Sequence, residues 1–380
     1  MEFPRTQLRA SIEIDLYALE RNLGRIKNFL PSSRSYIALV AADAFGIGLE
    51  AAVARLMISG ADAFAVTNLS EAVRVRKVGA GWPVIVLSAS IPQEEEQFVL
   101  NDITPTISSL EEAKRFEAAA EKFGKTASVH LKLPSQKSEI SIPDKDEAKK
   151  ILDFLLNSRN LNLEAFCVAG TGTGAPEEME IPDAEFLKYC AEKTAVCGKK
   201  IYVHHSDVFD PKILPSCFQT SLRAGLVLFG IRPEKNSILR DFNPEQVLSF
   251  KSAIAHIKEL PKDAYVGYSH TYKLKKDSKI ALVAAGYGDG LARSLGSRAN
   301  VIVRDTLLPI IGIVSMDQAA IDASALPNIH LSDEVVIIGS TRSQTITIED
   351  YCKTINITPA EALTAITQRV VRFYTAGTIK

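Results

Sequence analysis

Few side chains in this sequence stand where acid–base, nucleophilic or anion-binding chemistry is expected. One strong cation, Arg223, ends a short apolar run, and a hydroxyl, Ser206, follows the pair His204 and His205. Adjacent histidines in a strand point to opposite faces, so this pair does not predict a shared metal ion. The run 170–174 (Gly-Thr-Gly-Thr-Gly) could offer N–H groups to a phosphate, but it lacks the ending of a P-loop, which favours a flexible turn. What remains is an arginine and a serine that suit a small anion, unless Arg223 only forms an internal salt bridge.

The stretch 35–48 has the form in which α/β proteins present catalytic residues. A short apolar strand, 36–40, runs into a turn marked by Gly46 and Gly48, and a helical pattern follows. Chemistry is expected at the carboxyl end of such a strand, but the residue there is Ala41, which cannot act as base, nucleophile or ligand. The active site is therefore either elsewhere or has lost its reactive group.

The elements that must position these residues repeat one unit, a short apolar strand followed by an amphipathic helix. Helical patterns such as 69–78, 110–123 and 144–156 separate the strands. Eight strands are expected at 36–40, 63–67, 84–88, 104–107, 128–133, 163–169, 200–206 and 220–223. This spacing predicts a (β/α)8 barrel of the TIM type, with a doubly wound open sheet as the alternative.

A second domain is predicted after residue 245, where the strands become short and are separated by turn signals. Only 348–355 and 359–367 have helical patterns there, so the domain is mostly β. We therefore expect an α/β barrel over residues 1–245 and a C-terminal β domain over residues 246–380. Residues 11–15 alternate like a half-buried strand and are expected to pair with the β domain.

Composition excludes several classes of function. The formal net charge of −1 gives no electrostatic reason to expect nucleic acid or an anionic membrane as a partner. The five cysteines are odd in number and lack metal-type spacing, which suits reduced thiols. No signal peptide or membrane span is recognised, and a cytoplasmic location is expected.

Several motifs in register resemble the alanine racemase family, which belongs to the fold-type III pyridoxal phosphate (PLP) enzymes. They are "EIDLYALERNL" (13–23), "LRAGLVLFG" (222–230), "VGYSHTY" (266–272), "GYGDG" (286–290), "SMDQ" (315–318) and "RVVRFY" (369–374). The resemblance covers nearly the whole chain. It implies a barrel followed by a β domain, and a head-to-tail homodimer in which one subunit's β domain completes the other's active site.

The resemblance also implies that several functional positions of the family are changed here. The lysine that forms the Schiff base with PLP corresponds to Ala41, and the arginine that contacts the cofactor corresponds to Glu139. Four further family residues, a tyrosine, a histidine, a second histidine and a phosphate-contacting tyrosine, correspond to Phe45, Ile47, Ala169 and Ala360. Racemisation needs a base on one face of the substrate carbon and an acid on the other, and losing one such group costs about 10²–10⁴-fold in rate.

Other family positions are retained. Ser206, Arg223 and Gly225 match the residues that contact the phosphate and the ring nitrogen of PLP, and Tyr268 matches the second catalytic base. The positions at the substrate mouth are matched by Lys132, Tyr287, Met316 and Asp317. The aromatic members could alternatively serve only a dimer interface.

Three hypotheses follow. The first is a catalytically silent family member, retained as a dimeric binding or partner protein for a small anionic ligand near Ser206 and Arg223, with no covalently bound PLP. The second is an active PLP-dependent racemase that uses a relocated lysine, Lys132 or Lys137. The third is different chemistry in the same cavity, with Glu139 and Tyr268 as an acid–base pair.

Overall fold

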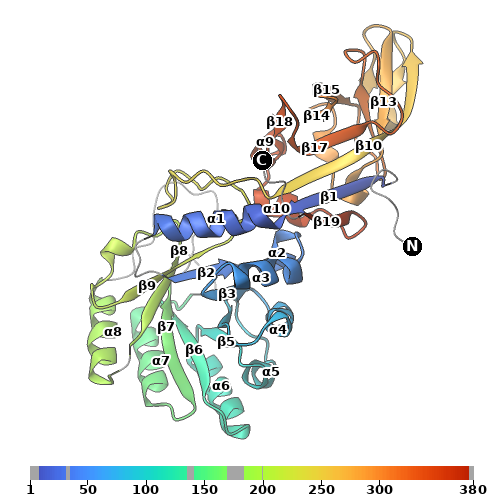
Figure 1. Cartoon of the computed structure of the whole chain (residues 1–380). Coiled ribbons are helices and arrows are strands. Elements are labelled where there is room, and N and C mark those ends of the chain that lie inside the picture. Colours follow the sequence, from blue (N-terminus) through green and yellow to red (C-terminus); the bar gives the residue numbers. More distant parts are fainter. Residues whose placement is uncertain (1–7, 31–34, 135–140, 169–183, 199, 376–380) are drawn as a thin grey trace.

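The chain folds into a closed barrel and a separate β domain, as the computed structural model shows for residues 8–30, 35–134, 141–168, 184–198 and 200–375 (Figure 1). The prediction of a (β/α)8 barrel followed by a mostly β domain is confirmed. Eight parallel strands close the barrel, with β2 paired to β9: β2 (Ser35–Leu39), β3 (Ala63–Val66), β4 (Val84–Val86), β5 (Thr104–Ile107), β6 (Ala127–Lys132), β7 (Leu161–Cys167), β8 (Tyr202–Ser206) and β9 (Gln219–Ala224).

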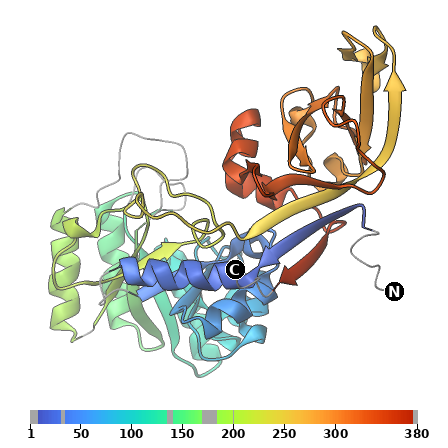
Figure 2. The same ribbon diagram turned by 45° about the horizontal axis from the view of Figure 1, so that its top comes forward.

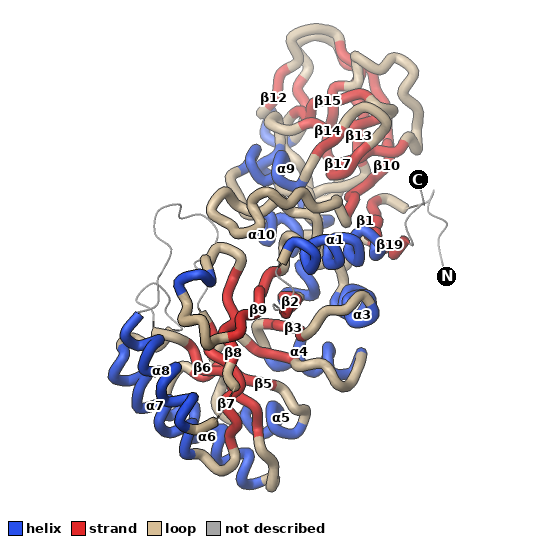
Figure 3. Tube along the Cα trace, turned by 60° about the vertical axis from the view of Figure 1, so that its left-hand side comes forward, coloured by secondary structure: helices blue, strands red, loops and turns tan. Residues whose placement is uncertain are grey.

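Helices cover the outside of the barrel strands (Figure 3). They are α1 (Leu16–Phe29), α3 (Leu49–Ile58), α4 (Leu69–Val78), α5 (Glu95–Leu100), α6 (Leu110–Lys122), α7 (Lys145–Asn157) and α8 (Ala184–Val196). The short segment α2 (Ala41–Phe45) is a turn that follows β2. The longer ones begin at side-chain caps: Ser109 accepts from the N–H of Glu112, and Asp144 accepts from the N–H groups of Asp146 and Glu147. Their apolar stripes pack against the outer face of the barrel.

The β domain is built on a nine-stranded sheet. Its strands are β1 (Ala10–Asp15), β10 (Leu248–Leu260), β13 (Ser278–Val283), β14 (Asn300–Val303), β15 (Thr306–Ile311), β16 (Ala319–Asp322), β17 (Glu334–Ser340), β18 (Thr345–Ile346) and β19 (Val371–Thr375). A small hairpin, β11 (Tyr265–Val266) and β12 (Tyr272–Lys273), and two helices, α9 (Ile348–Ile355) and α10 (Pro359–Thr364), complete it.

Both ends of the described chain join the two domains. The strand β1 pairs antiparallel with β10 and parallel with β19, so residues 10–15 lie in the sheet of the β domain (Figure 2). Asp15 ends β1 and caps α1, because its carboxylate accepts from the N–H groups of Tyr17 and Ala18. The N-terminal segment therefore passes directly from the sheet to a helix of the barrel.

The stretch of the β domain that carries Tyr268 is not a continuous strand. Residues 264–272 fold as β11, a 3-10 turn at Tyr268–His270, and β12. Gly267 (φ 80°) and His270 (φ 51°) have left-handed backbone conformations, which a strand cannot contain. Tyr268 therefore lies on a turn. Across the part of the chain that the structure describes, no helix combines the length and hydropathy that crossing a bilayer requires.

Candidate functional site

Ala41 lies at the carboxyl end of the first barrel strand, as the sequence predicts, and begins a turn of unusual handedness. The four residues that follow, Ala42 to Phe45, have φ between 53° and 57°, and Gly46 continues at 77°. A left-handed conformation costs roughly 1–2 kcal/mol for each residue that has a Cβ atom. The methyl group of Ala41 is buried at 7% exposure. A strained turn is thus maintained beside a residue that carries no functional group.

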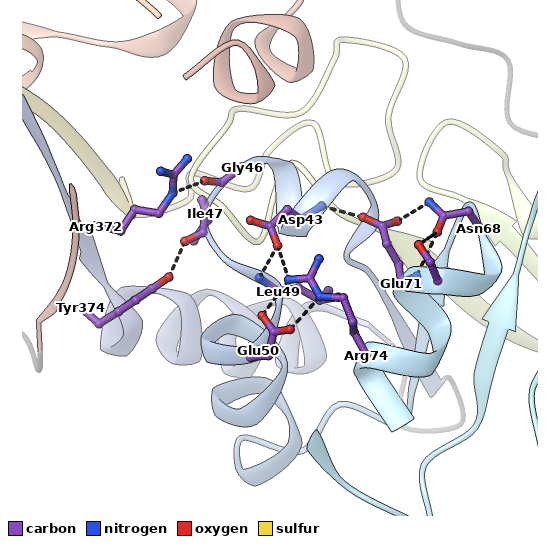
Figure 4. A network of polar contacts seen from close by, with 11 residues as sticks. Asp43, Gly46, Ile47, Leu49, Glu50, Asn68, Glu71, Arg74, Arg372 and Tyr374 are labelled. Atoms are coloured by element: carbon purple, nitrogen blue, oxygen red, sulfur yellow. Dashed lines mark hydrogen bonds and ion pairs between the residues drawn. The ribbon is translucent and has the colours of Figure 1, made fainter. Parts of the chain in front are cut away.

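A polar network on one side holds this turn in place (Figure 4). The Asp43 N–H donates to Glu71 at 2.7 Å, and the Asp43 carboxylate accepts from Arg74 at 2.6 Å. Arg74 also donates to both oxygens of Glu50 at 2.7 and 2.8 Å, and this contact lowers the pKa of Glu50. The helices α3 and α4 of the barrel are in this way tied to the turn α2.

The β domain holds the other side of the turn. The Arg372 guanidinium donates to the Gly46 carbonyl at 2.9 Å, and the Tyr374 hydroxyl donates to the Ile47 carbonyl at 2.9 Å (Figure 4). A Cβ atom on Gly46 would lie 2.7 Å from the Leu363 carbonyl oxygen of α10, so glycine is needed at this close approach. Ala360 lies on the same helix and is half-buried.

The interior of the barrel is divided into an apolar half and a polar half. Strands β2 to β4 contribute an apolar cluster: Ile37, Leu39, Ala63, Ala65, Ile85 and Leu87. Strands β5 to β9 contribute buried polar residues: Thr104, Thr106, His130, Lys132, His204, Ser221 and Arg223. Because barrel interiors are usually filled by branched apolar residues, the polar half marks the side where chemistry or binding is expected.

Arg223 starts a chain of hydrogen bonds through this polar half. It donates from Nη1 to His204 Nδ1 at 2.6 Å, and His204 Nε2 meets His130 Nδ1 at 3.0 Å. His130 Nε2 then meets the Tyr202 hydroxyl at 3.1 Å. Arginine can only donate, so His204 accepts at Nδ1 and carries its proton on Nε2, and His130 likewise carries its proton on Nε2. Both imidazoles are therefore neutral.

Burial and the guanidinium charge keep the two histidines neutral. Desolvation, and then the charge of Arg223, lower the pKa of His130 to about 3. The same two causes, followed by the neighbouring histidines, hold the pKa of His204 well below its usual value. Desolvation also raises the pKa of Tyr202. The hydrogen-bonded series Arg223, His204, His130 and Tyr202 contains no negative charge that could offset the guanidinium.

Arg223 itself is a buried cation whose partners in the described part of the chain are all neutral. Its exposure is 7%, and besides His204 it donates from Nη1 to Cys167 Sγ at 3.4 Å and from Nη2 to the Val168 carbonyl at 3.3 Å. No carboxylate among the described residues forms an ion pair with it. The salt bridge considered from the sequence is therefore not what holds Arg223.

Ser206 stands beside Arg223. The two residues are register partners on β8 and β9, so their side chains point to the same face. The Ser206 hydroxyl oxygen is buried and has no hydrogen-bond partner in the described structure. His205 points the other way and packs against Phe209, at 5.3 Å between ring centroids, as the alternation of the strand predicts.

Gly225 lies two residues after Arg223, and the ring of Phe45 covers it. A Cβ atom there would lie 2.8 Å from Phe45 Cε2 and 2.8 Å from the Leu39 carbonyl oxygen, so only glycine fits. The Phe45 ring also packs against Phe229, at 5.4 Å between centroids. An apolar ring thus lies over the backbone next to the buried arginine.

Lys132 is the one predicted mouth residue that lies in the barrel. It ends β6, is 3% exposed, and is the register partner of Cys167. Lys137, Glu139, Ala169 and the run 170–174 lie outside the described residues.

The other predicted mouth residues lie in the β domain. Tyr268, Tyr287 and Met316 are exposed at 72%, 47% and 51%. The Tyr287 N–H donates to the Ser315 carbonyl, which places the loops 286–290 and 315–318 together, and Asp317 pairs with Arg369 at 2.7 Å. Within one protomer, no hydrogen bond or ion pair of the described residues joins this set to Ser206 or Arg223.

The sequence analysis missed His130 and Cys167. His130 lies on a strand whose polar residues alternate with apolar ones, Ser128, His130 and Lys132, whereas Cys167 ends an apolar run, 165–167, that carries no such signal. Because strands of a parallel barrel are buried on both faces, such alternation indicates side chains that point into the barrel. That signal could have identified the polar half.

Comparisons with known proteins give the family. Residues 14–233 match the N-terminal domain of alanine racemase, and residues 247–374 match its C-terminal domain. Similar proteins include alanine racemase 1 of Caldanaerobacter subterraneus subsp. tengcongensis, 28% identical over 97% of this chain and 95% of that protein. The alanine racemase of Methylacidiphilum infernorum is 31% identical over 96% of this chain and 92% of that protein.

Solved structures of alanine racemases have the same fold as this chain. The alanine racemase of Clostridium difficile 630 superposes with a TM-score of 0.85 at 26% identity, over 97% of this chain and 96% of that one. The same fold occurs in the enzyme of Bartonella henselae, solved with covalently bound pyridoxal phosphate, at a TM-score of 0.82, 21% identity, and coverage of 97% and 100%. With both domains matched in order over almost its full length, this chain belongs to the alanine racemase family.

Proposed function

We propose that this family member does not racemise amino acids and instead binds a small anion in the barrel mouth, as a dimeric binding or partner protein. The observation that carries the proposal is the buried guanidinium of Arg223, which has no carboxylate partner among the described residues. Burying an unpaired charge is costly, and such charges in proteins are normally paired. An anion beside Arg223 and Ser206 would supply the missing partner.

The family uses PLP, and the residues present here fit that group poorly. The amine that tethers it is replaced, in the register of the family motif, by the methyl group of Ala41. The Phe45 ring lies over Gly225, where the motif places a phosphate contact. For these reasons no step of a reaction is assigned to PLP in this chain.

A second candidate is an active racemase with a relocated lysine. It is favoured by Lys132, a buried primary amine at the carboxyl end of β6. A desolvated lysine can act as a nucleophile toward carbonyl groups. The proposed base on the opposite face would be Tyr268, which is exposed in this protomer.

One experiment separates the two candidates. The purified protein is incubated with PLP and borohydride, and we measure the visible absorption, the mass added covalently, and alanine racemisation. We expect no covalent adduct and no turnover for the natural chain, whereas Ala41→Lys should acquire an adduct at residue 41. Ala42→Lys is the matched control, because it adds an amine to an exposed neighbour. An adduct at Lys132 of the natural chain, with racemase turnover, would overturn the proposal.

A further inference from the structure

The hydrogen bonds of Arg223 use only part of its donor set. A guanidinium carries five N–H groups, two on each terminal nitrogen and one on Nε. Both Nη1 hydrogens are engaged, one by His204 and one by Cys167, and one Nη2 hydrogen is engaged by the Val168 carbonyl. Two donors remain, Nε–H and the second Nη2–H.

The remaining donors lie on one edge of the guanidinium. Nη1 and Nη2 both reach the consecutive residues Cys167 and Val168, so the edge between these two nitrogens faces the end of β7. The adjoining edge, formed by Nε–H and the second Nη2–H, presents two parallel donors. Such an edge matches the two oxygens of a planar carboxylate.

Ser206 adds a third donor on the same face of the barrel wall as Arg223. It is the register partner of Arg223, and its buried hydroxyl is unpartnered in the described structure. On the other side, β2 places Ile37 in register with Arg223, and Ile37 belongs to the apolar half of the barrel. The anion site thus has three donors on one side and an apolar wall on the other.

Charge and shape select among anions. Arg223 contributes one positive charge, which a monoanion would balance, because both nearby histidines are neutral. Lys132, the other buried cation of the polar half, is not without a partner of its own. A phosphate, which is largely dianionic at neutral pH, normally takes more N–H donors, and the backbone next to Arg223 is covered by the Phe45 ring. These two arguments disfavour a phosphate at this position.

We infer that the ligand of the barrel mouth is a small monocarboxylate, held by two parallel hydrogen bonds from Arg223 Nε and Nη2 and by the Ser206 hydroxyl. This inference rests on the proposed anion-binding function and gives its ligand a chemical class. The carboxylate plane lies in the plane of the guanidinium, and the rest of the ligand extends toward the apolar half of the barrel.

Binding is tested with the full chain, using calorimetry and ligand-observed NMR. The probes are acetate and propionate, their neutral amides acetamide and propionamide, and inorganic phosphate. We expect saturable binding of the carboxylates and none of the amides, which have the same shape without the charge. Phosphate is expected to bind at least about tenfold more weakly, since each charge-assisted hydrogen bond that is not made costs that much or more.

Two variants locate the site. Arg223→Lys keeps the charge but removes the fork, and should weaken propionate binding about tenfold or more. Ser206→Ala removes one donor and should weaken it several-fold. Arg304→Lys is the control, because Arg304 is an exposed arginine paired with Asp333 in the β domain. The Arg304→Lys variant should bind propionate as tightly as the natural chain does. If Arg223→Lys does not fold, Ser206→Ala and the comparison of carboxylate with amide still show whether a carboxylate binds at this site.

The possible failures are distinguishable. Binding of phosphate but not of carboxylates, with sensitivity to Ser206→Ala, would overturn the carboxylate inference and leave an anion-binding function standing. Equal binding of propionate and propionamide would also overturn the inference. If the folded protein binds none of these anions, both the inference and the proposed function are wrong.

Discussion

At the scale of single residues, the site depends on a cation that is buried among neutral groups. Arg223 is held by an imidazole, a thiol and a carbonyl, and the imidazole of His204 is in turn held by His130. Each acceptor offers a lone pair without a charge, which satisfies the hydrogen-bond donors and leaves the charge uncompensated. The two histidines can accept these hydrogen bonds only while their imidazoles are neutral.

This requirement predicts loss of stability in acid. The pKa values of His130 and His204 are lowered on folding, so the unfolded chain binds protons that the native chain does not bind. For His130 the stabilising effect is complete above the unfolded pKa of about 6.5 and is lost as pH falls toward about 3, and for His204 it is lost in the same direction. Each histidine should contribute about 1.4 kcal/mol per pH unit to the fall in the free energy of unfolding within that window.

Urea unfolding at a series of pH values measures this slope. His130→Gln should make the slope shallower, whereas His256→Gln should leave it unchanged, because His256 is exposed. A slope that is the same in all three proteins would contradict the assignment of neutral, buried imidazoles.

At the scale of elements, the left-handed turn α2 is the most constrained segment near the site. Its backbone strain is offset by contacts from both domains, from Glu71 and Arg74 on the barrel side and from Arg372 and Tyr374 on the β-domain side. The turn therefore joins the barrel mouth to the β domain even though Ala41 carries no reactive group.

The handedness of this turn predicts an inversion of the usual effect of glycine. Ala42 is exposed at φ 53°, so Ala42→Gly should raise the free energy of unfolding by about 1 kcal/mol by removing the strain of the Cβ atom. Ala54 is exposed in the right-handed helix α3, and Ala54→Gly should lower the free energy of unfolding by about 1 kcal/mol. Urea unfolding compares the two variants, and destabilisation by both would show that α2 is right-handed in solution.

At the scale of the whole molecule, the residues that match the family's catalytic, cofactor and substrate-mouth positions are divided between the two domains. Tyr268, Tyr287 and Met316 present exposed apolar surface on the β domain, while Ser206 and Arg223 lie in the barrel. We propose that a second copy of the chain brings the two sets together, as the resemblance to the family implies. Aromatic residues and methionine are enriched in such interfaces.

The dimer predicts a change of mass on substitution. Light scattering after size exclusion should give twice 41.4 kDa for the natural chain, and a shift toward 41.4 kDa for the double variant Tyr268→Asp, Met316→Asp. Ile58→Asp is the control, because Ile58 is an equally exposed apolar residue on a barrel helix and should leave the mass unchanged. A natural chain of 41.4 kDa at micromolar concentration would contradict the proposal.

The sequence by itself determined the architecture and the places of Ala41, Ser206 and Arg223 at the carboxyl ends of barrel strands. Strand–helix alternation over residues 36–223 predicts a barrel because each short apolar run must be covered by the helix that follows it. The position of Ala41 after the first barrel strand also follows from local pattern, and so does the opposite orientation of His204 and His205. These are effects of short range along the chain.

Only the tertiary structure decided what Arg223 contacts. His130, Cys167, His204 and Arg223 lie on four different strands, and their side chains meet because closure of the barrel turns alternate residues of all eight strands inward. The absence of a described carboxylate beside Arg223, and the cover that Phe45 forms over Gly225, likewise depend on which strands are brought together. No spacing along the sequence contains that information, because it arises from the pairing of β2 with β9 that completes the barrel.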